Sequence, residues 1–240
     1  NPQYVVPSNL TATYGETLSN VSLPTGFSWV EETSTSVGDY GNNTFHVNYT
    51  PSDTDNYNVV SNIEVVVVVT KISPNLVITN SENLSKNYDG EAVTSPSYTK
   101  NGDGAVSVLY KLKTESDDTY SNVEPVSAGN YVVKVSVEET QKYSAQAVMC
   151  EFTISKATPE YDAPTGLIAS YGQTLANVEL PAGFTWVEDL TTSVGNAGTN
   201  TFHVTFTPQD TTNYNVVEGI KIEIEVLKQS PGLEITNKNS

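Results

Sequence analysis

The chain has 240 residues, with 28 Asp and Glu against 11 Lys and no Arg, so its formal net charge is -17. This balance excludes nucleic acid as a partner and an anionic membrane surface as a binding site, because both require clustered positive charge. Tyr, Val, Thr, Ser and Asn are abundant while charged residues make up 16% of the chain, a composition typical of β-sheets joined by polar turns.

The first strong strand pattern covers residues 44–49, where Phe45, Val47 and Tyr49 alternate with Thr44, His46 and Asn48. Successive side chains of a strand point to opposite faces of its sheet. We therefore expect the first set in a core and the second set in solvent. Upstream, residues 17–21 are the expected position of one short helix if the module is β-grasp-like.

The next strand, residues 63–69, differs in that Val occupies both faces from Val65 onward. A strand that is apolar on both faces is either covered on both or prone to aggregation. We therefore predict that Val66 and Val68 contact a neighbour, either the middle part of this chain or another chain.

Further along the chain, Asn101-Gly102-Asp103-Gly104 predicts a hairpin turn between strands at 97–100 and 105–108. In the strand at 148–154, alternation places the single cysteine, Cys150, on the same face as Phe152, which indicates a small buried side chain. The last strand alternates Ile220, Ile222, Ile224 and Val226 with polar residues, which predicts a sheet with one solvated face.

Two long segments of the chain repeat without a gap. Tyr14-Gly15-Glu16-Thr17-Leu18 recurs as Tyr171-Gly172-Gln173-Thr174-Leu175, an offset of 171 minus 14, or 157. The sequence between the two copies ends at Lys156-Ala157-Thr158-Pro159, which is similar to Lys71-Ile72-Ser73-Pro74 at the end of the first copy. We infer three modules, the first (1–71), the middle (72–156) and the third (157–228), followed at 229–240 by the start of another module of the middle type.

This repetition predicts an all-β chain of three small tandem modules in an elongated array, each an immunoglobulin-like sandwich or a β-grasp-like sheet. The connections are short and contain Pro, which restricts the backbone. The chain opens within the repeat pattern, so we expect it to be part of a longer protein. No run approaches the roughly 20 apolar residues of a membrane span.

Several motifs carry a family resemblance. The first and third modules contain Tyr-Gly-x-Thr-Leu, Leu-Pro-x-Gly-Phe-x-Trp, Thr-Ser-Val-Gly and Asn-Tyr-Asn, and the middle module contains Asn87-Tyr88-Asp89-Gly90. With these motifs the chain resembles the MBG-type (first and third) and YDG-type (middle) repeat domains of bacterial cell-surface proteins. The resemblance implies an extracellular, surface-exposed, non-enzymatic repeat of adhesin-like proteins, whose partners are neighbouring modules. It does not imply a ligand.

Residues suited to chemistry are few. His46 and His203 occupy equivalent positions without a second His in their modules, which favours surface residues over a metal or catalytic site. Trp29 and Trp186 are either core residues or platforms for stacking sugars. We expect no catalytic residue, cofactor or metal; interdomain calcium near Asp117 and Asp118 is an alternative.

Three functions follow from these features. The leading one is a structural stalk, and the second is a binding module that contacts host glycan or host protein through Trp29, Trp186, His46 or His203. An enzyme is the third, and the absence of a recognisable nucleophile, base or phosphate loop in the sequence argues against it.

Overall fold

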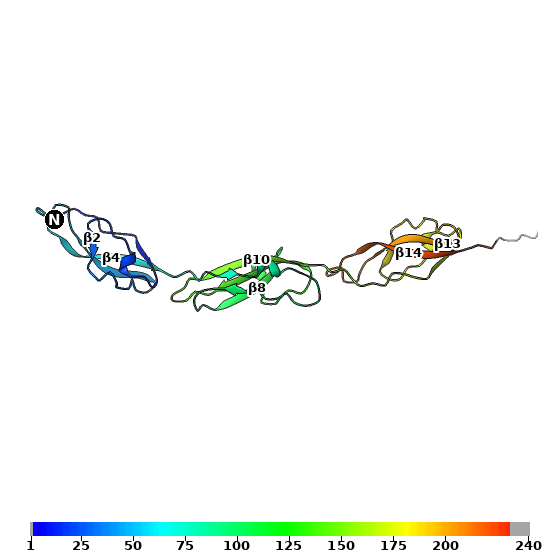
Figure 1. The fold of residues 1–240 in the computed structure, drawn as a ribbon, viewed down its shortest axis with the longest axis horizontal. Helices are drawn as coiled ribbons and strands as arrows, with labels where there is room; N and C mark the ends of the chain where they lie inside the picture. Colours follow the sequence, from blue (N-terminus) through cyan, green and yellow to red (C-terminus); the bar gives the residue numbers. More distant parts are fainter. Residues whose placement is uncertain (1, 231–240) are drawn as a thin grey trace, which may run out of the picture. The chain divides into compact units, whose positions relative to one another are not determined.

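The structure is a computed structural model that describes residues 2–230 (Figure 1). These residues form two compact units. The first unit contains the residues up to Leu84, Thr94–Val123 and Tyr131–Phe152, and the second contains Ser85–Val93, Glu124–Asn130 and the described residues from Thr153 onward.

The regular elements are mainly strands, with short 3-10 helices (η) between them. In the first unit and the middle module they are β1 (Leu10–Thr13), η1 (Leu18–Asn20), β2 (Phe27–Trp29), β3 (Gly41–Tyr49), β4 (Val60–Thr70), β5 (Val77–Ile78), η2 (Ser81–Asn83), β6 (Lys86–Asn87), β7 (Tyr98–Thr99), β8 (Val106–Leu112), η3 (Asp117–Thr119), β9 (Gly129–Val137) and β10 (Gln146–Ser155). In the third module they are β11 (Leu167–Ser170), η4 (Leu175–Asn177), β12 (Phe184–Trp186), β13 (Gly198–Phe206) and β14 (Val217–Leu227). The chain is therefore an all-β protein of three small tandem modules.

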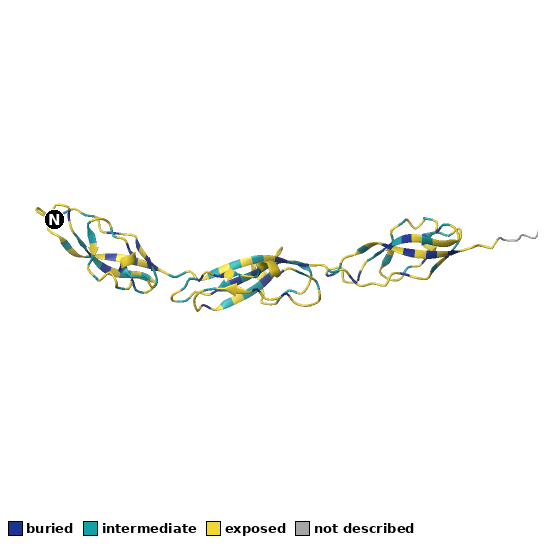
Figure 2. Ribbon diagram, in the orientation of Figure 1, coloured by how far each residue is buried: buried dark blue, intermediate teal, exposed yellow. Residues whose placement is uncertain are grey.

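The first module contains one four-stranded sheet in the order β1-β4-β3-β2. Strands β1 and β4 are parallel, whereas β3 pairs with β4 and β2 in antiparallel fashion. Phe45 and Val47 are buried and Thr44 is exposed, as predicted, whereas Tyr49, His46 and Asn48 are all half-buried. Figure 2 shows the same alternation of buried and exposed positions along the long strands.

A short helix covers the buried face of this sheet where the sequence places it. Helix η1 follows Thr17, whose backbone N–H donates to the Asn20 side chain at 3.1 Å, and Leu18 on η1 is fully buried. Among the described residues, the module has a single mixed sheet. Of the two alternatives, the architecture is thus closer to a β-grasp than to a sandwich, with one 3-10 turn in place of a longer helix.

The middle module adds a second, smaller layer. Its main sheet has the order β6-β10-β9-β8, and β5 pairs with β7 in a separate two-stranded sheet. Leu76, directly before β5, packs against Val135 and Val137 of β9 and is almost fully buried. The segment that leads into the two-stranded sheet thereby covers part of the apolar face of the main sheet.

The predicted hairpin at 97–108 is wrong. Strand β7 pairs with β5, and β8 pairs with β9, so the turn connects two different sheets. Contacts outside the flanking strands hold the turn: the Asn101 N–H donates to the Pro74 carbonyl at 2.6 Å, and a Cβ on Gly102 would lie 2.6 Å from the Tyr143 ring.

In the second unit, the third module repeats the topology of the first. Its sheet has the order β11-β14-β13-β12, with β11 parallel to β14. Ile220, Ile222, Ile224 and Val226 are buried and the residues between them are exposed, as predicted. The expected further module at 229–240 lies, from residue 231 onward, outside the described residues.

Candidate functional site

An aromatic cluster occupies the same place in both copies of the repeated module. In the first module the rings of Tyr4, Phe27 and Tyr49 meet, with 4.9 Å between the centroids of Phe27 and Tyr49 and 5.1 Å between those of Tyr4 and Tyr49. In the third module Tyr161, Phe184 and Phe206 are arranged in the same way, also with 4.9 Å between the two Phe rings. Tyr161 is 37% exposed and the other rings are half-buried.

This cluster accounts for part of the Leu-Pro-x-Gly-Phe-x-Trp motif. A Cβ on Gly26 would lie 3.0 Å from the Tyr49 ring, and one on Gly183 would lie 3.0 Å from the Phe206 ring. Glycine therefore allows the ring to close over the backbone. Sequence reasoning missed Tyr4 and Tyr161, although their equivalence at the offset of 157 was a usable signal.

The two Trp side chains lie half-buried on the core side of their sheets. Trp29 meets Phe45 edge-on at 6.1 Å between centroids, and Trp186 meets Phe202 at the same separation. Each Trp packs against the buried core of its own module, with one side left open.

In the third module this open side borders a groove of about 590 Å³. Its apolar wall includes Trp186, Phe184 and Leu190, the last of which is 53% exposed, and Glu188 and Asp189 lie at its rim. The corresponding residues in the first module are Trp29, Phe27, Thr33, Glu31 and Glu32. The groove thus offers aromatic surface beside carboxylates, the combination by which proteins contact sugar rings and hydroxyl groups.

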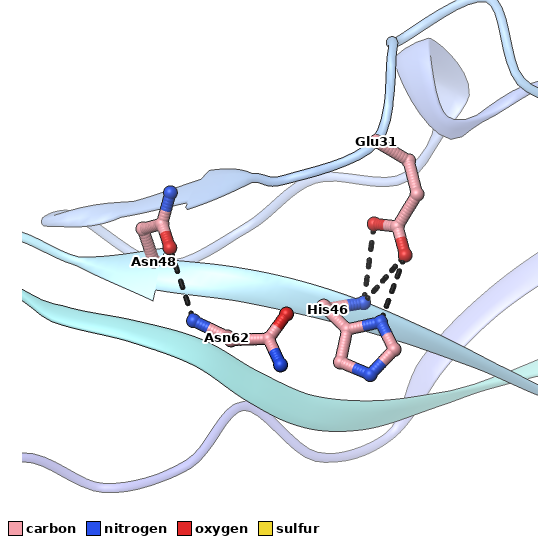
Figure 3. A network of polar contacts seen from close by, with 4 residues as sticks. All are labelled: Glu31, His46, Asn48 and Asn62. Carbon is pink, nitrogen blue, oxygen red and sulfur yellow. Dashed lines mark hydrogen bonds and ion pairs between the residues drawn. The ribbon is translucent and has the colours of Figure 1, made fainter.

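The two His residues are held by carboxylates that the sequence interpretation did not pair with them. In the first module the Glu31 carboxylate accepts hydrogen bonds from the His46 backbone N–H, at 3.1 Å to each oxygen, and lies 3.0 Å from ring Nδ1 (Figure 3). In the third module Glu188 contacts His203 in the same way, with 2.8 Å to Nδ1.

Strand geometry explains this pair. Strand β12 ends at Trp186, opposite Val204, so the neighbouring His203 N–H lies beyond the last residue of β12 in the ladder. Glu188 supplies the acceptor instead. Burial alone would raise the pKa of Glu188, but hydrogen bonds from the His203 side chain and backbone outweigh it and lower that pKa, and the same causes lower the pKa of Glu31. Each Glu therefore completes a sheet edge in its charged form.

A second polar contact lies beside this pair in the first module. Asn62 has a positive φ of 60°, at an irregularity in the pairing of β3 with β4. Its backbone N–H donates to the Asn48 side chain at 3.1 Å (Figure 3). The equivalent residue in the third module is Gly219, with φ of 69°, which adopts this conformation without strain.

The remaining predicted residues lie apart from these clusters. Val66 and Val68 are 41% and 40% exposed on the outer face of β4, and their contact with a neighbour stays a prediction. Cys150 is half-buried, and burial raises the pKa of its thiol. Asp117 pairs with Lys111 at 3.0 Å, and the described residues contain no group of three His, Cys, Asp or Glu side chains suited to a metal.

Comparison with known proteins gives little beyond this geometry. No protein-family model matches the chain, and no curated protein matches it. Among solved structures the chain is similar to Drosophila N-cadherin EC1-4, at 8% identity over 95% of this chain and 74% of that chain, with a TM-score of 0.31. A similarity at this level identifies neither a family nor a function. No helix within the described residues is long and apolar enough to cross a membrane.

Proposed function

We propose that the chain is a non-catalytic stalk region of a bacterial cell-surface protein, built from MBG-type and YDG-type repeats and associated with adhesins. In this role the modules hold another part of the protein away from the cell. Their partners are neighbouring modules, and they require no cofactor.

The observation that carries the proposal is that the motif residues serve the modules themselves. Phe27 and Trp29 pack within the first module, Phe184 and Trp186 pack within the third, and each His is engaged by a carboxylate of its own module. A repeat whose signature residues maintain its fold suits a spacer, because a spacer needs modules that fold identically wherever they occur in the array.

Small-angle X-ray scattering on the 240-residue chain tests this role. An extended particle is expected, and a globular particle would contradict a spacer. A glycan and mucin array with the same chain supplies the second readout, on which a spacer gives no specific signal.

The second candidate function is glycan binding, and the groove beside Trp186 is the observation that favours it. If the groove binds a sugar, the array gives a specific signal that Trp186→Phe weakens, because Phe offers a smaller stacking surface. Leu190→Thr, which installs the residue of the first copy at the groove wall, gives the matched comparison. A signal that neither substitution alters would place any binding elsewhere.

A further inference from the structure

The connection from each module to the next is a single lysine. Strand β4 ends at Thr70, and Ile72 already forms a parallel bridge with Tyr143 of the middle module. Strand β10 likewise ends at Ser155, and Ala157 forms a parallel bridge with Tyr214 of the third module. Only Lys71 and Lys156 therefore lie between the last strand of one module and the first bridge of the next. The Pro residues that we expected in the linkers lie inside the downstream modules.

The same hydrogen bonds form both bridges. At the first, the Ile72 N–H donates to the Lys142 carbonyl at 2.9 Å and the Ser144 N–H donates to the Ile72 carbonyl at 3.0 Å. At the second, the Ala157 N–H donates to the Asn213 carbonyl and the Asn215 N–H donates to the Ala157 carbonyl, both at 2.9 Å.

Each lysine side chain reaches the loop that contains this bridge. Lys71 Nζ lies 2.6 Å from the Thr140 carbonyl oxygen and 2.5 Å from Glu139 Oε1, and its side chain is only 11% exposed. Lys156 Nζ lies 2.7 Å from the Thr211 carbonyl oxygen. Thr140 and Thr211 each stand three residues before the bridged Tyr, so the two lysines bind equivalent positions. The first contact lies within the first unit and the second within the second unit.

The loop has one sequence pattern in all three modules: an acidic residue, then Thr, then Tyr three positions after the Thr. The three examples are Asp53-Thr54-x-x-Tyr57, Glu139-Thr140-x-x-Tyr143 and Asp210-Thr211-x-x-Tyr214. The pKa of Asp210 is lowered chiefly by the Asn213 side-chain hydrogen bond, with a smaller part from the charge of Lys156. An acidic residue therefore lies near the lysine in both joints.

A tyrosine completes each contact on the upstream side. Tyr14, Tyr88 and Tyr171 are equivalent. The backbone N–H of each donates to the carbonyl oxygen of the residue that precedes the terminal lysine of its module, at 2.8, 2.8 and 2.9 Å. Lys142 Nζ lies 5.8 Å from the centre of the Tyr14 ring, and the Tyr214 ring meets Tyr88 edge-on at 5.3 Å. These are the Tyr residues of the Tyr-Gly-x-Thr-Leu and Tyr-Asp-Gly motifs.

Exposure of the equivalent Tyr residues agrees with this role. Tyr14 and Tyr88, which meet a downstream loop, are half-buried. Tyr171 is 52% exposed, and Lys228 beside it is exposed as well. Tyr57, the loop Tyr of the first module, is 45% exposed.

We propose that the terminal lysine and the motif tyrosine of each module form a socket that binds the acidic-Thr-x-x-Tyr loop of the following module, and that Tyr171 and Lys228 form the same socket for a module of the middle type. The occupant of this last socket follows from sequence, since Lys228-x-Ser230-Pro231 repeats Lys71-x-Ser73-Pro74 and Leu233-x-Ile235-Thr236-Asn237 repeats Leu76-x-Ile78-Thr79-Asn80. The inference does not rest on the stalk role, because a binding array has equal use for such joints.

Double electron–electron resonance between spin labels tests the sockets in the full chain. With Cys150→Ser as background, labels at the exposed positions Thr44 and Ser107, both in the first unit, report on the first joint, and labels at Asn87 and Thr201, both in the second unit, report on the second. Both distance distributions should be narrow. Lys71→Met should broaden only the first and Lys156→Met only the second, by about twofold, because modules without a fixed contact move relative to each other.

Three comparisons make the test decisive. Lys221→Met, on the outer face of β14, should change neither distribution. Lys71→Arg, which keeps a cationic donor for the Thr140 carbonyl and the Glu139 carboxylate, should leave the first distribution narrow. In a chain extended after Lys228 by a second copy of residues 72–156, Lys228→Met should broaden the distance from the third module to the added one.

Broad distributions in the parent chain, or distributions that the Met substitutions leave unchanged, would overturn the proposal. Circular dichroism on every variant verifies that the modules stay folded. If a Met variant unfolds, Lys71→Gln or Lys156→Gln takes its place, because Gln stays polar but is too short to reach the loop carbonyl. A failed stalk function would instead appear as a specific signal on the glycan array, which is independent of the distance distributions.

Discussion

Replacing Glu188 with Gln should destabilise the third module. The Glu188 carboxylate accepts the His203 backbone N–H with both oxygens and lies 2.8 Å from ring Nδ1. Gln keeps the shape but loses the charge and one acceptor oxygen. Hydrogen bonds to charged groups contribute about 1.5 to 3 kcal/mol net and neutral ones about 0.5 to 1.5. Because both side chains are partly exposed, we expect the lower part of that difference, about 1 kcal/mol.

A loss of about 1 kcal/mol lowers the melting temperature of a module of this size by about 4 to 8 °C. Urea unfolding followed by Trp186 fluorescence, in a Trp29→Phe background, reports on the third module alone because the chain has two Trp. Amide hydrogen exchange at His203 should accelerate in Glu188→Gln. Glu223→Gln, an exposed residue on the outer face of β14, is the matched control and should change neither measurement.

The effect should depend on pH with a defined sign. The pKa of Glu188 is lowered in the folded state from its ordinary value of 4.5. A group with a depressed folded pKa stabilises the protein above its unfolded pKa and loses that contribution as pH falls through the folded value. The difference between the parent chain and Glu188→Gln should thus be full at pH 7 and shrink as the pH falls below the ordinary pKa of 4.5. An equal difference at pH 7 and pH 3, or none at pH 7, would refute the edge-completion role.

Further substitutions test other parts of the modules. Asn62→Gly should be tolerated while Asn62→Ala should cost about 1 kcal/mol in urea unfolding, because Ala is disfavoured at positive φ; equal stability of the two would contradict the strain at that position. Gly183→Ala should destabilise more than Gly172→Ala by about 1 kcal/mol, since both have positive φ but only the former meets an aromatic ring; thermal melts of equal shift would argue against the close approach. Val66→Glu with Val68→Glu should fold normally, as the third module carries Glu at both equivalent positions, and should reduce self-association or interdomain stability; sedimentation and melting data identical to the parent would show that this pair contacts no neighbour.

Periodic features of the fold were predictable from sequence because alternation is a local signal. The inward positions of β3 and β14 and the helix near Thr17 follow from patterns within a few residues. The hairpin at 97–108 failed because turn residues indicate a reversal without specifying which strands pair. In the structure, β7 pairs with a strand that lies some twenty residues earlier in the chain.

The polar contacts were less predictable than the core. Glu31 and His46 are 15 residues apart, and their meeting depends on where β2 ends relative to β3. The repeat held a usable signal, since Glu188 and His203 recur at the same spacing. The joint loops were harder to recognise, because the sequence does not show that the loop containing each Tyr lies beside the terminal lysine of another module. Its role follows only when Tyr57, Tyr143 and Tyr214 are compared in three dimensions.

The equal construction of the two joints also bears on how such an array changes in length. The first joint connects the first module to the middle one and the second connects the middle module to the third, yet Lys71 and Lys156 bind the same loop position. Duplication or deletion of a whole number of modules, as in unequal recombination between gene repeats, then leaves every surviving junction with a matching lysine and loop. A change that cuts inside a module separates a lysine from its strand and disrupts a sheet, so array length is expected to change in steps of entire modules.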